Sequence, residues 1–279
     1  MAIKTEREAV RLTDAEAKRL LRLYEQGEKK ILSNINQAML RGGDPAYLRA
    51  VQRNIASTRR ELLKGARSWS QNVIPSLYRE GMAYADGMAF STHLMAGFGS
   101  IHQQAAKALA DATFSRFQDV DQVIGRRVDD IFRAVQLEAS EGTVLGYQSY
   151  QQTAKRMKEA LAEKGITGFV DKRGRQWTIS SYAKMATHQV AMESFREGTR
   201  LRLLEHGYDL VIFSAHGGAC PSCVPWEGRT VSLTGKTDGY PTLADARAGG
   251  MLHVGCRHCY TLSGDERKRH EDMENMSGR

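Results

Sequence analysis

The chain has 279 residues, of which 41% are hydrophobic and 26% are charged, and its formal net charge is +8. Ordinary globular proteins have these proportions, so we expect a packed core rather than disorder. No stretch approaches the roughly 18 apolar residues of a membrane span, and the N-terminal segment lacks the apolar run of a signal peptide. We therefore expect no membrane contact and a protein made and kept on the cytosolic side.

Residues 1–165 are predicted to form one helix after another, because helix-favouring residues dominate and the chain has only five prolines. Thr13 is the expected N-cap of the first helix, and Glu16 would complete a capping box. "RGGDP" (Arg41–Pro45) predicts the end of this helix, since paired glycines followed by Asp-Pro favour a turn.

Further helices are expected in the same region. The second spans about 46–64, the third begins at about Ser76, and "AGFGS" (Ala96–Ser100) marks the next break. The segment Ile101–Ser140 is long and amphipathic. We interpret its apolar stripe, which includes Val120, as a surface that packs against other helices.

A row of cations in the second predicted helix is a candidate surface for binding nucleic acid or another anion. Its members recur at spacings of four, seven, four and three residues, which places them on one helical face: Arg49, Arg53, Arg60, Lys64 and Arg67. Such a row can follow DNA phosphates without reading the base sequence. A solvated helix face, or a face that docks on an acidic protein, would show the same pattern.

The composition changes after residue 165. The segment Gly165–Ser180 alternates in the manner of a β-hairpin, and the helix that follows it is expected to close at Gly207. "DLVIFSA" (Asp209–Ala215) is a candidate buried strand, and "TLADARAGG" is a candidate short helix. The residues after Gly264 are polar and mixed in charge, as in a flexible tail.

The expected fold is therefore mainly α, with three parts along the chain. Residues 1–165 form a long helical region, to which we assign assembly contacts. Residues 166–264 form a small α+β domain with a zinc-knuckle-like clip. Residues 265–279 form a flexible charged tail.

All cysteines of the chain lie in two C-x2-C pairs separated by 32 residues: Cys220, Cys223, Cys256 and Cys259. In a reducing compartment, two such pairs favour a metal site over disulfides, and tetrahedral zinc takes four ligands of this kind. The pairs could also pack as buried thiols without a metal. Thioredoxin-like redox chemistry is a further alternative, but it leaves the second pair unexplained.

The ligand list has one open position. Cys220, Cys223 and Cys256 belong to every version, and the fourth ligand is His253 or Cys259. Two other histidines, His258 and His216, are more distant candidates.

The spacing favours a structural zinc over a catalytic one. A catalytic zinc keeps one position open for water and needs a base nearby. The chain contains neither H-E-x-x-H nor the H-x-E of the nucleic-acid deaminases. Nothing marks Glu227, Asp238 or Asp245, the acids between the two pairs, as a base. We therefore expect a structural Zn²⁺ and no enzymatic activity.

Three blocks follow one another in the C-terminal third: "DKRGRQWTISSYAKMATHQVA", "EHGYDLVIFSAHGGACPSCVPWEGRTVSLTG" and "YPTLADARAGGMLHVGCRHCYTL". In this order they resemble the phage minor capsid protein 2 family, which is related to the Mu F-like head-morphogenesis proteins. The resemblance covers about Phe169 to Leu262. It implies a virion protein present in few copies, at the portal or the inner capsid face, without an established catalytic activity.

The chain departs from the family pattern at two points. Val254 and Gly255 stand where similar members often have an aromatic residue or proline. Many members also replace the cysteines, which again favours a structural role for the metal. His253 and Cys256 are usual family positions and Cys259 is not, so the resemblance favours His253 as the fourth ligand.

The main hypothesis is a structural minor capsid protein of a tailed bacteriophage, located in the virion, in the capsid interior or portal region, and in the host cytoplasm during assembly. Its expected partners are the portal or the major capsid protein, with packaged double-stranded DNA as a further candidate. One alternative is a zinc-dependent hydrolase or nuclease that uses His216, Glu227, His253 and His258. Another is a sequence-independent DNA-binding module inside the phage head.

Overall fold

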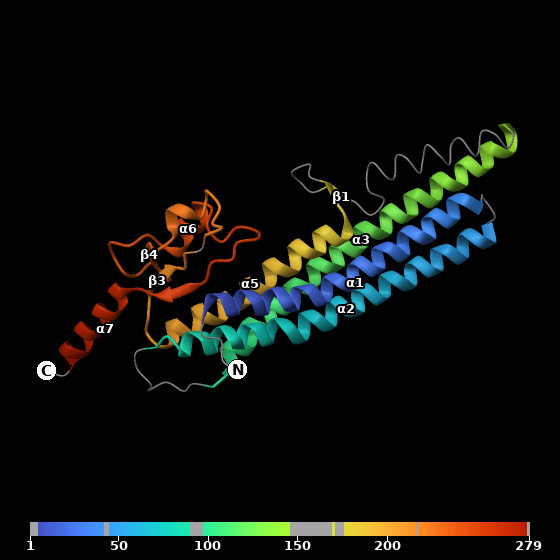
Figure 1. Cartoon of the computed structure of the whole chain (residues 1–279). Helices are drawn as coiled ribbons and strands as arrows, with labels where there is room; N and C mark the ends of the chain where they lie inside the picture. Colours follow the sequence, from blue (N-terminus) through green and yellow to red (C-terminus); the bar gives the residue numbers. More distant parts are fainter. Residues whose placement is uncertain are drawn as a thin grey trace. The chain divides into compact units, whose positions relative to one another are not determined.

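The structure is a computed structural model, and it describes residues 5–41, 45–89, 97–145, 169–170, 176–215 and 217–277. Long helices precede short strands along the chain (Figure 1). The helices are α1 (Glu6–Arg41), α2 (Pro45–Asp86), α3 (Ser100–Leu145), α5 (Ile179–Glu205), α6 (Leu243–Ala248) and α7 (Gly264–Ser277), and a 3₁₀ turn, η1, spans Val224–Trp226. The strands are β1 (Phe169–Val170), β2 (Gln176–Trp177), β3 (Leu210–Phe213), β4 (Thr230–Ser232) and β5 (Tyr260–Leu262). The mainly α fold with a small C-terminal sheet is confirmed.

The chain divides into two compact units. The helical unit comprises Lys18–Ser70 and Ala112–Ala186, and the sheet unit comprises Met1–Ala17, Gln71–Asp111 and Thr187–Arg279. The helices α1, α2, α3 and α5 each contribute residues to both units. The domain division after residue 165 stays a prediction.

In the helical unit, α1, α2 and α3 each bury one face. The buried residues recur at spacings of three, four and seven, as packed helices require: Leu20, Tyr24, Ile31 and Ile35 on α1, Leu48, Val51, Ile55 and Leu62 on α2, and Phe117, Val120, Ile124 and Val128 on α3. The packing of α1 on α2 is close, because a Cβ on Gly27 would lie 2.7 Å from Leu62 Cδ2. Between α2 and α3, the Arg59 guanidinium donates to both carboxylate oxygens of Asp121, at 2.9 and 2.8 Å.

In the sheet unit, β3 is the central strand of an antiparallel sheet with the order β4-β3-β5. Val211 pairs with Val231 on one side and with Leu262 on the other. The strand predicted from "DLVIFSA" and the helix predicted from "TLADARAGG", which is α6, are both confirmed. The expected hairpin is confirmed as well, with β1 antiparallel to β2.

Two glycines set how closely α2 and α5 cross in the sheet unit. A Cβ on Gly81 would overlap the carbonyl oxygen of Phe195, and a Cβ on Gly198 would overlap that of Tyr78. The Thr199 hydroxyl also donates to the carbonyl oxygen of Gly81, at 3.1 Å. The backbones of the two helices therefore touch, and this contact fixes the position of α5.

The first helix begins earlier than predicted, so Thr13 as its N-cap is wrong. The T-x-x-E pattern occurs twice, and Thr5 forms the capping box: Glu8 N donates to Thr5 Oγ1 at 3.3 Å, and Thr5 N donates to Glu8 Oε2 at 3.1 Å. Thr13 is buried within α1 and donates its hydroxyl to Val10 O at 3.0 Å. The break expected at "RGGDP" is confirmed, because α1 ends at Arg41 and α2 begins at Pro45.

The predicted second and third helices form one continuous helix, α2, with Pro75 inside it. Proline removes one backbone hydrogen bond but does not stop a helix whose apolar face stays buried on both sides. Trp69, Ile74 and Leu77 are all buried. Their burial carries the helix through the proline.

The polar C-terminal segment forms helix α7, which corrects the expectation of a flexible tail. Glu266 N donates to Ser263 Oγ at 3.0 Å and so caps the helix. The Glu266 carboxylate is fully buried and accepts from the backbone N–H groups of Asp209, at 3.1 Å, and of Leu210. The first turn of α7 is therefore tied to the start of β3, although its composition resembles that of a solvated segment.

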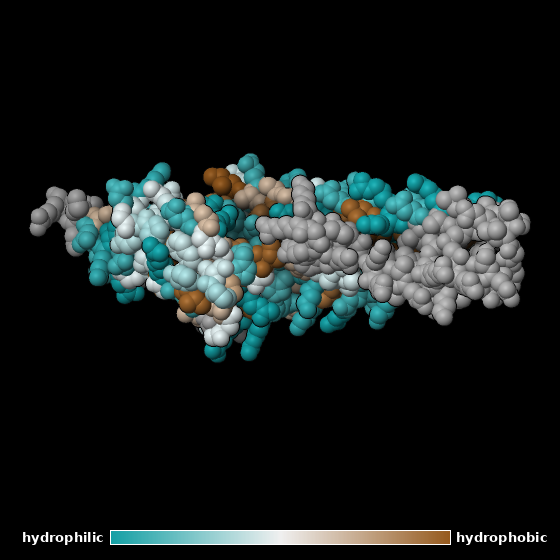
Figure 2. All heavy atoms as spheres, turned by 90° about the horizontal axis from the view of Figure 1, so that it is seen from above, coloured by the Kyte–Doolittle hydropathy of each residue, from teal (hydrophilic) through white to brown (hydrophobic). Residues whose placement is uncertain are grey.

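No helix among the described residues is both long and apolar enough to cross a membrane. On the face shown in Figure 2, hydrophilic residues predominate among the coloured atoms, and hydrophobic residues form small separate patches.

Replacing Gly198 by alanine should destabilise the fold, because the new methyl group has no room beside the carbonyl oxygen of Tyr78. Overpacking costs about 1–3 kcal/mol, whereas alanine adds back about 1 kcal/mol of helix propensity. Urea unfolding measures the balance. Gly264→Ala is the matched control, since nothing lies within 4 Å of its added Cβ. A Gly198→Ala protein as stable as the wild type would contradict the close crossing.

Candidate metal centre

The first cysteine pair lies on a tight turn after β3. Cys223 N donates to Cys220 O at 2.9 Å, and Val224 N donates to the same oxygen at 3.1 Å. This turn places both thiols on one side of the loop. The 3₁₀ turn η1 follows directly, so Trp226 lies close to the pair in sequence.

The second loop approaches the first at two glycines. A Cβ on Gly249 would lie 2.7 Å from the indole ring of Trp226, and a Cβ on Gly250 would lie 3.0 Å from Ser222 Cβ. The next turn closes with Cys256 N donating to His253 O at 3.0 Å. Gly255, inside that turn, has φ +84°, which a residue with a side chain adopts only with strain. The glycines therefore bring the two loops into contact.

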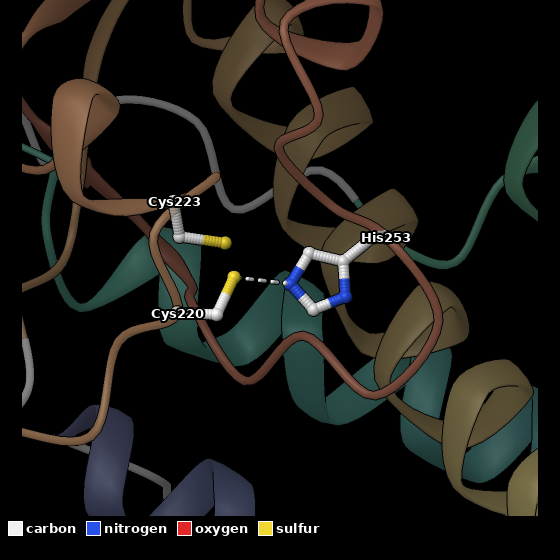
Figure 3. Close-up of side chains that lie close together, drawn as sticks. All are labelled: Cys220, Cys223 and His253. Atoms are coloured by element: carbon white, nitrogen blue, oxygen red, sulfur yellow. Dashed lines mark hydrogen bonds between the residues drawn. The ribbon is translucent and has the colours of Figure 1, made fainter.

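Sulfur and imidazole donors from the two loops gather around Cys223. One group is Cys220, Cys223 and His253, and the other is Cys223, Cys256 and His258; within each group the donor atoms lie within 4.8 Å of one another. Figure 3 shows the first group, in which His253 Nε2 lies 3.0 Å from Cys220 Sγ. In the second group, His258 Nδ1 lies 3.3 Å from Cys256 Sγ. His258, a more distant candidate from the sequence, is thus part of the donor cluster.

Each of the two histidines is oriented through its other nitrogen. His253 Nδ1 lies 2.8 Å from Val254 O. His258 Nε2 lies 2.8 Å from Glu227 Oε1. Partners of this kind fix the ring orientation of metal-binding histidines in proteins. His258 thus lies between the Glu227 carboxylate and the Cys256 thiol.

Two of the thiols have the thiolate character that metal binding requires. Burial alone would raise the pKa of Cys256, but the hydrogen bond from His258 and the charge of Arg196 outweigh it and lower the pKa to about 6. For Cys220, burial is likewise outweighed by hydrogen bonds from Cys223 and from backbone N–H groups, which lower the pKa to about 7. The thiolate, not the thiol, is the metal ligand.

Helix α5 holds the second loop through a buried guanidinium. Arg196 is only 4% exposed, and its Nε donates to His258 O at 2.8 Å while Nη2 donates to Cys256 O. Gln189, on the same helix, accepts from Gly255 N at 3.2 Å. No local motif marks Arg196 as a partner of the cysteine loop, so the sequence could not reveal it.

Cys259 belongs to neither donor group. It is 1% exposed and packs against Tyr84, Met192 and Phe195, and burial raises the pKa of its thiol to about 12. The ladder of β5 extends to this residue, because Ser214 N donates to Cys259 O at 3.0 Å. Its surroundings thus differ from those of His258, which lies between Cys256 and Glu227. His216 lies outside the described residues.

The donor cluster lines a cavity of about 910 Å³ within the sheet unit. The first turns of α1 supply part of its wall, and their polar side chains there are Glu6, Arg7, Arg11 and Asp14. An ion could therefore reach the sulfur atoms through this cavity.

Two of the acids between the cysteine pairs have partners. Glu227 pairs with His258, as described above. Asp245 caps α6, since its carboxylate accepts from Thr242 N at 2.7 Å while Thr242 Oγ1 accepts from Asp245 N. In the cavity wall, Asp14 pairs with His188 and Arg257.

The predicted anion-binding residues lie on α2 in the helical unit, and all of them are exposed: Arg49, Arg53, Arg60, Lys64 and Arg67. Arg67 lies over the ring of Phe114, with its Cζ 4.6 Å from the ring centroid.

The family model described as "Phage minor capsid protein 2" matches residues 11–263. The chain belongs to the phage minor capsid protein 2 family. A protein called "Structural protein" from Lactococcus phage LL-H is 25% identical over 100 residues, which are 33% of this chain and 27% of that protein. The match thus spans about a quarter of that relative's length. No solved structure matches the chain significantly.

Membership extends further than the sequence motifs suggested. The motifs covered the C-terminal third, whereas the family match begins in α1 and ends just before α7. The helical region is therefore part of this minor capsid protein family and not an unrelated addition to it.

Replacing Arg196 by methionine should destabilise this minor capsid protein, because the buried carbonyl groups of Cys256 and His258 would lose their donors. Unsatisfied buried acceptors cost about 1–3 kcal/mol. Urea unfolding followed by tryptophan fluorescence measures the change. Arg200→Met is the control: Arg200 pairs with Glu197 of its own helix, and the expected cost is under about 1 kcal/mol. Equal stabilities of the two variants would show that the loop does not depend on Arg196.

Proposed function

We propose that this chain is a structural component of a tailed-phage head, present at the portal or the inner capsid face, and that one zinc ion joins the two cysteine loops of its sheet unit. Membership in the minor capsid family and the likeness to a phage structural protein support the role in the head. The observation that carries the zinc proposal is the convergence of four other sulfur and imidazole donors around Cys223.

The donor set fits zinc. Zinc prefers thiolate and imidazole ligands in tetrahedral geometry, and the cluster offers three thiols and two imidazoles. Bound zinc would neutralise the thiolates and cross-link the two loops. The proposed ligands are Cys220, Cys223, Cys256 and His253.

The two histidines are oriented in equivalent ways. The carbonyl oxygen of Val254 accepts from His253 Nδ1 and leaves Nε2 facing Cys220 Sγ. The Glu227 carboxylate accepts from His258 Nε2 and leaves Nδ1 facing Cys256 Sγ. His253 reaches from the second loop to a cysteine of the first, whereas His258 lies beside Cys256 of its own loop, so His253 is the fourth ligand that we propose for an ion joining the two loops. In this proposal His258 and Glu227 position Cys256.

The role we propose is not catalytic. Glu227 and Asp245 have structural partners, and the chain lacks the metalloprotease and deaminase motifs. The hydrolase or nuclease alternative would have to use an acid of the cavity wall, such as Glu6, as its base.

The purified chain should contain about one zinc per molecule, measured by elemental analysis. The Cys220→Ala/Cys223→Ala variant should lose the zinc and unfold at a lower temperature. His253→Ala should lose most of the zinc, whereas His258→Ala should keep it with an affinity weaker by about 10–100-fold.

Cys259→Ala is the matched control for this experiment, because it removes a thiol that belongs to neither donor group. It should retain the full zinc content. If Cys259→Ala lost zinc while His253→Ala kept it, the ligand assignment would be wrong. A metal-free preparation that melted at the same temperature as the zinc form would rule out a structural zinc.

The role in the head predicts a specific partner. The tagged full chain, mixed with the portal protein and the major capsid protein of its phage, should retain at least one of them. Mass spectrometry of purified virions should detect the chain in few copies per particle. The proposal would be refuted if purified virions lacked the chain and the tagged chain retained neither the portal protein nor the major capsid protein.

A further inference from the structure

One face of α2 in the helical unit carries only cations, small residues and polar uncharged residues. The opposite face of the helix is buried, through residues such as Val51, Ile55 and Leu62. The cations lie on the exposed side: Arg49, Arg53, Arg60, Lys64 and Arg67. At 100° per residue they fall within about 60° of one another around the helix axis. We call this set the basic face.

Acidic residues are absent from the basic face. Between residues 46 and 71 the only acid is Glu61, which lies on the flank of α2 and pairs with Lys30 of α1 at 3.6 Å. Arg59 lies on the other flank and pairs with Asp121 of α3. Within the described residues, no cation of the basic face forms an ion pair. Its charge is therefore unbalanced by any carboxylate of α2 itself.

The exposed side of α3 in the same unit shows a different pattern. Its exposed cations alternate with exposed acids: Arg116, Arg126, Arg127 and Arg133 with Asp119, Asp129 and Asp130. Arg133 and Asp130 form an ion pair at 3.6 Å. Mixed charge of this kind is typical of a solvated helix. The single sign on α2 is therefore a local feature and not a consequence of the chain's overall positive charge.

We propose that the basic face binds the phosphate backbone of double-stranded DNA without reading its sequence. From Arg49 to Arg67 the row is about 27 Å long at 1.5 Å per residue, and a DNA strand presents one phosphate about every 3.4 Å along its axis. Because both strands carry these phosphates around the whole duplex, a row of cations meets phosphates wherever it lies on the DNA surface, whereas an acidic protein surface would need its own matching arrangement. Four of the five cations are arginines, whose guanidinium groups pair with phosphate oxygens in bidentate geometry. This contact lies beyond the structural role proposed above.

The experiment measures the affinity of the full chain for a labelled random-sequence duplex at several salt concentrations. Each phosphate contact contributes a slope of about −0.9 to log K against log salt, so five contacts predict about a 500-fold loss of affinity between 50 and 200 mM. The Arg53→Gln/Arg60→Gln/Lys64→Gln variant keeps two contacts and should lose only about 12-fold over the same range. Its affinity at low salt should fall as well.

The matched control is Arg126→Gln/Arg127→Gln/Arg133→Gln, which removes the same charge from the exposed side of α3. It should keep the wild-type salt slope. An Arg53→Lys/Arg60→Lys variant keeps the charge and should keep most of the DNA affinity. It shows whether the loss in the glutamine variant comes from the missing charge or from a folding defect. Thermal unfolding of all variants serves as a check, since the substituted side chains are exposed.

Three results would overturn the proposal. The first is wild-type DNA binding that does not weaken steeply with salt, and the second is an equal loss of DNA affinity in the two triple variants. The third is an α2 variant that still binds DNA but no longer binds the portal or capsid protein, which would show that the basic face binds an acidic protein. Zinc content and incorporation into virions are measured separately, so a failure here leaves the role in the head to its own tests.

Discussion

The sheet unit depends on the tie between the buried guanidinium of Arg196 and the carbonyl groups of the second cysteine loop. The sheet itself is small, with β3 only four residues long and β4 and β5 three residues each. Strands this short form a marginal sheet unless other elements pack against them. Arg196 supplies such support from α5, and the close contact of α5 with α2 at Gly81 and Gly198 fixes the position of α5. The position of the metal centre therefore follows from helix packing.

The chemistry of the thiols sets a second requirement. Cys223 is 1% exposed and lies beside Cys220 and Cys256, and burial together with these neighbours raises its pKa to about 12. The same cluster lowers the pKa of Cys220 and of Cys256. A third thiolate beside two others is costly without a cation, because like charges this close disfavour one another. The zinc ion proposed above would remove this cost, because a bound cation stabilises every thiolate that it contacts.

The elements that depend on a local sequence pattern could be predicted from the sequence. Helical periodicity located the long helices, and Gly-Gly-Asp-Pro located the end of α1. Prediction failed where distant contacts decide: the burial of Trp69, Ile74 and Leu77 carries α2 through Pro75, and the contact of Glu266 with β3 orders α7. The cysteine spacing identified Cys220, Cys223, His253 and Cys256, which do lie in the donor cluster, but it could not separate them from Cys259. Cys259 packs instead among Tyr84, Met192 and Phe195, and only the folded loop brings Glu227 to His258.

The family motif acquires a physical meaning from these loops. In "PWEGR", Trp226 packs on Gly249, Arg229 lies over the Trp226 ring with its Cζ 5.0 Å from the centroid, and Gly228 has φ +69°. The contact of Trp226 with Gly249 joins the two loops without using a thiol, and the Arg196 tie holds the second loop to α5. A frame of this kind can form before a metal binds. Bound zinc would therefore add stability to a frame that packing already defines.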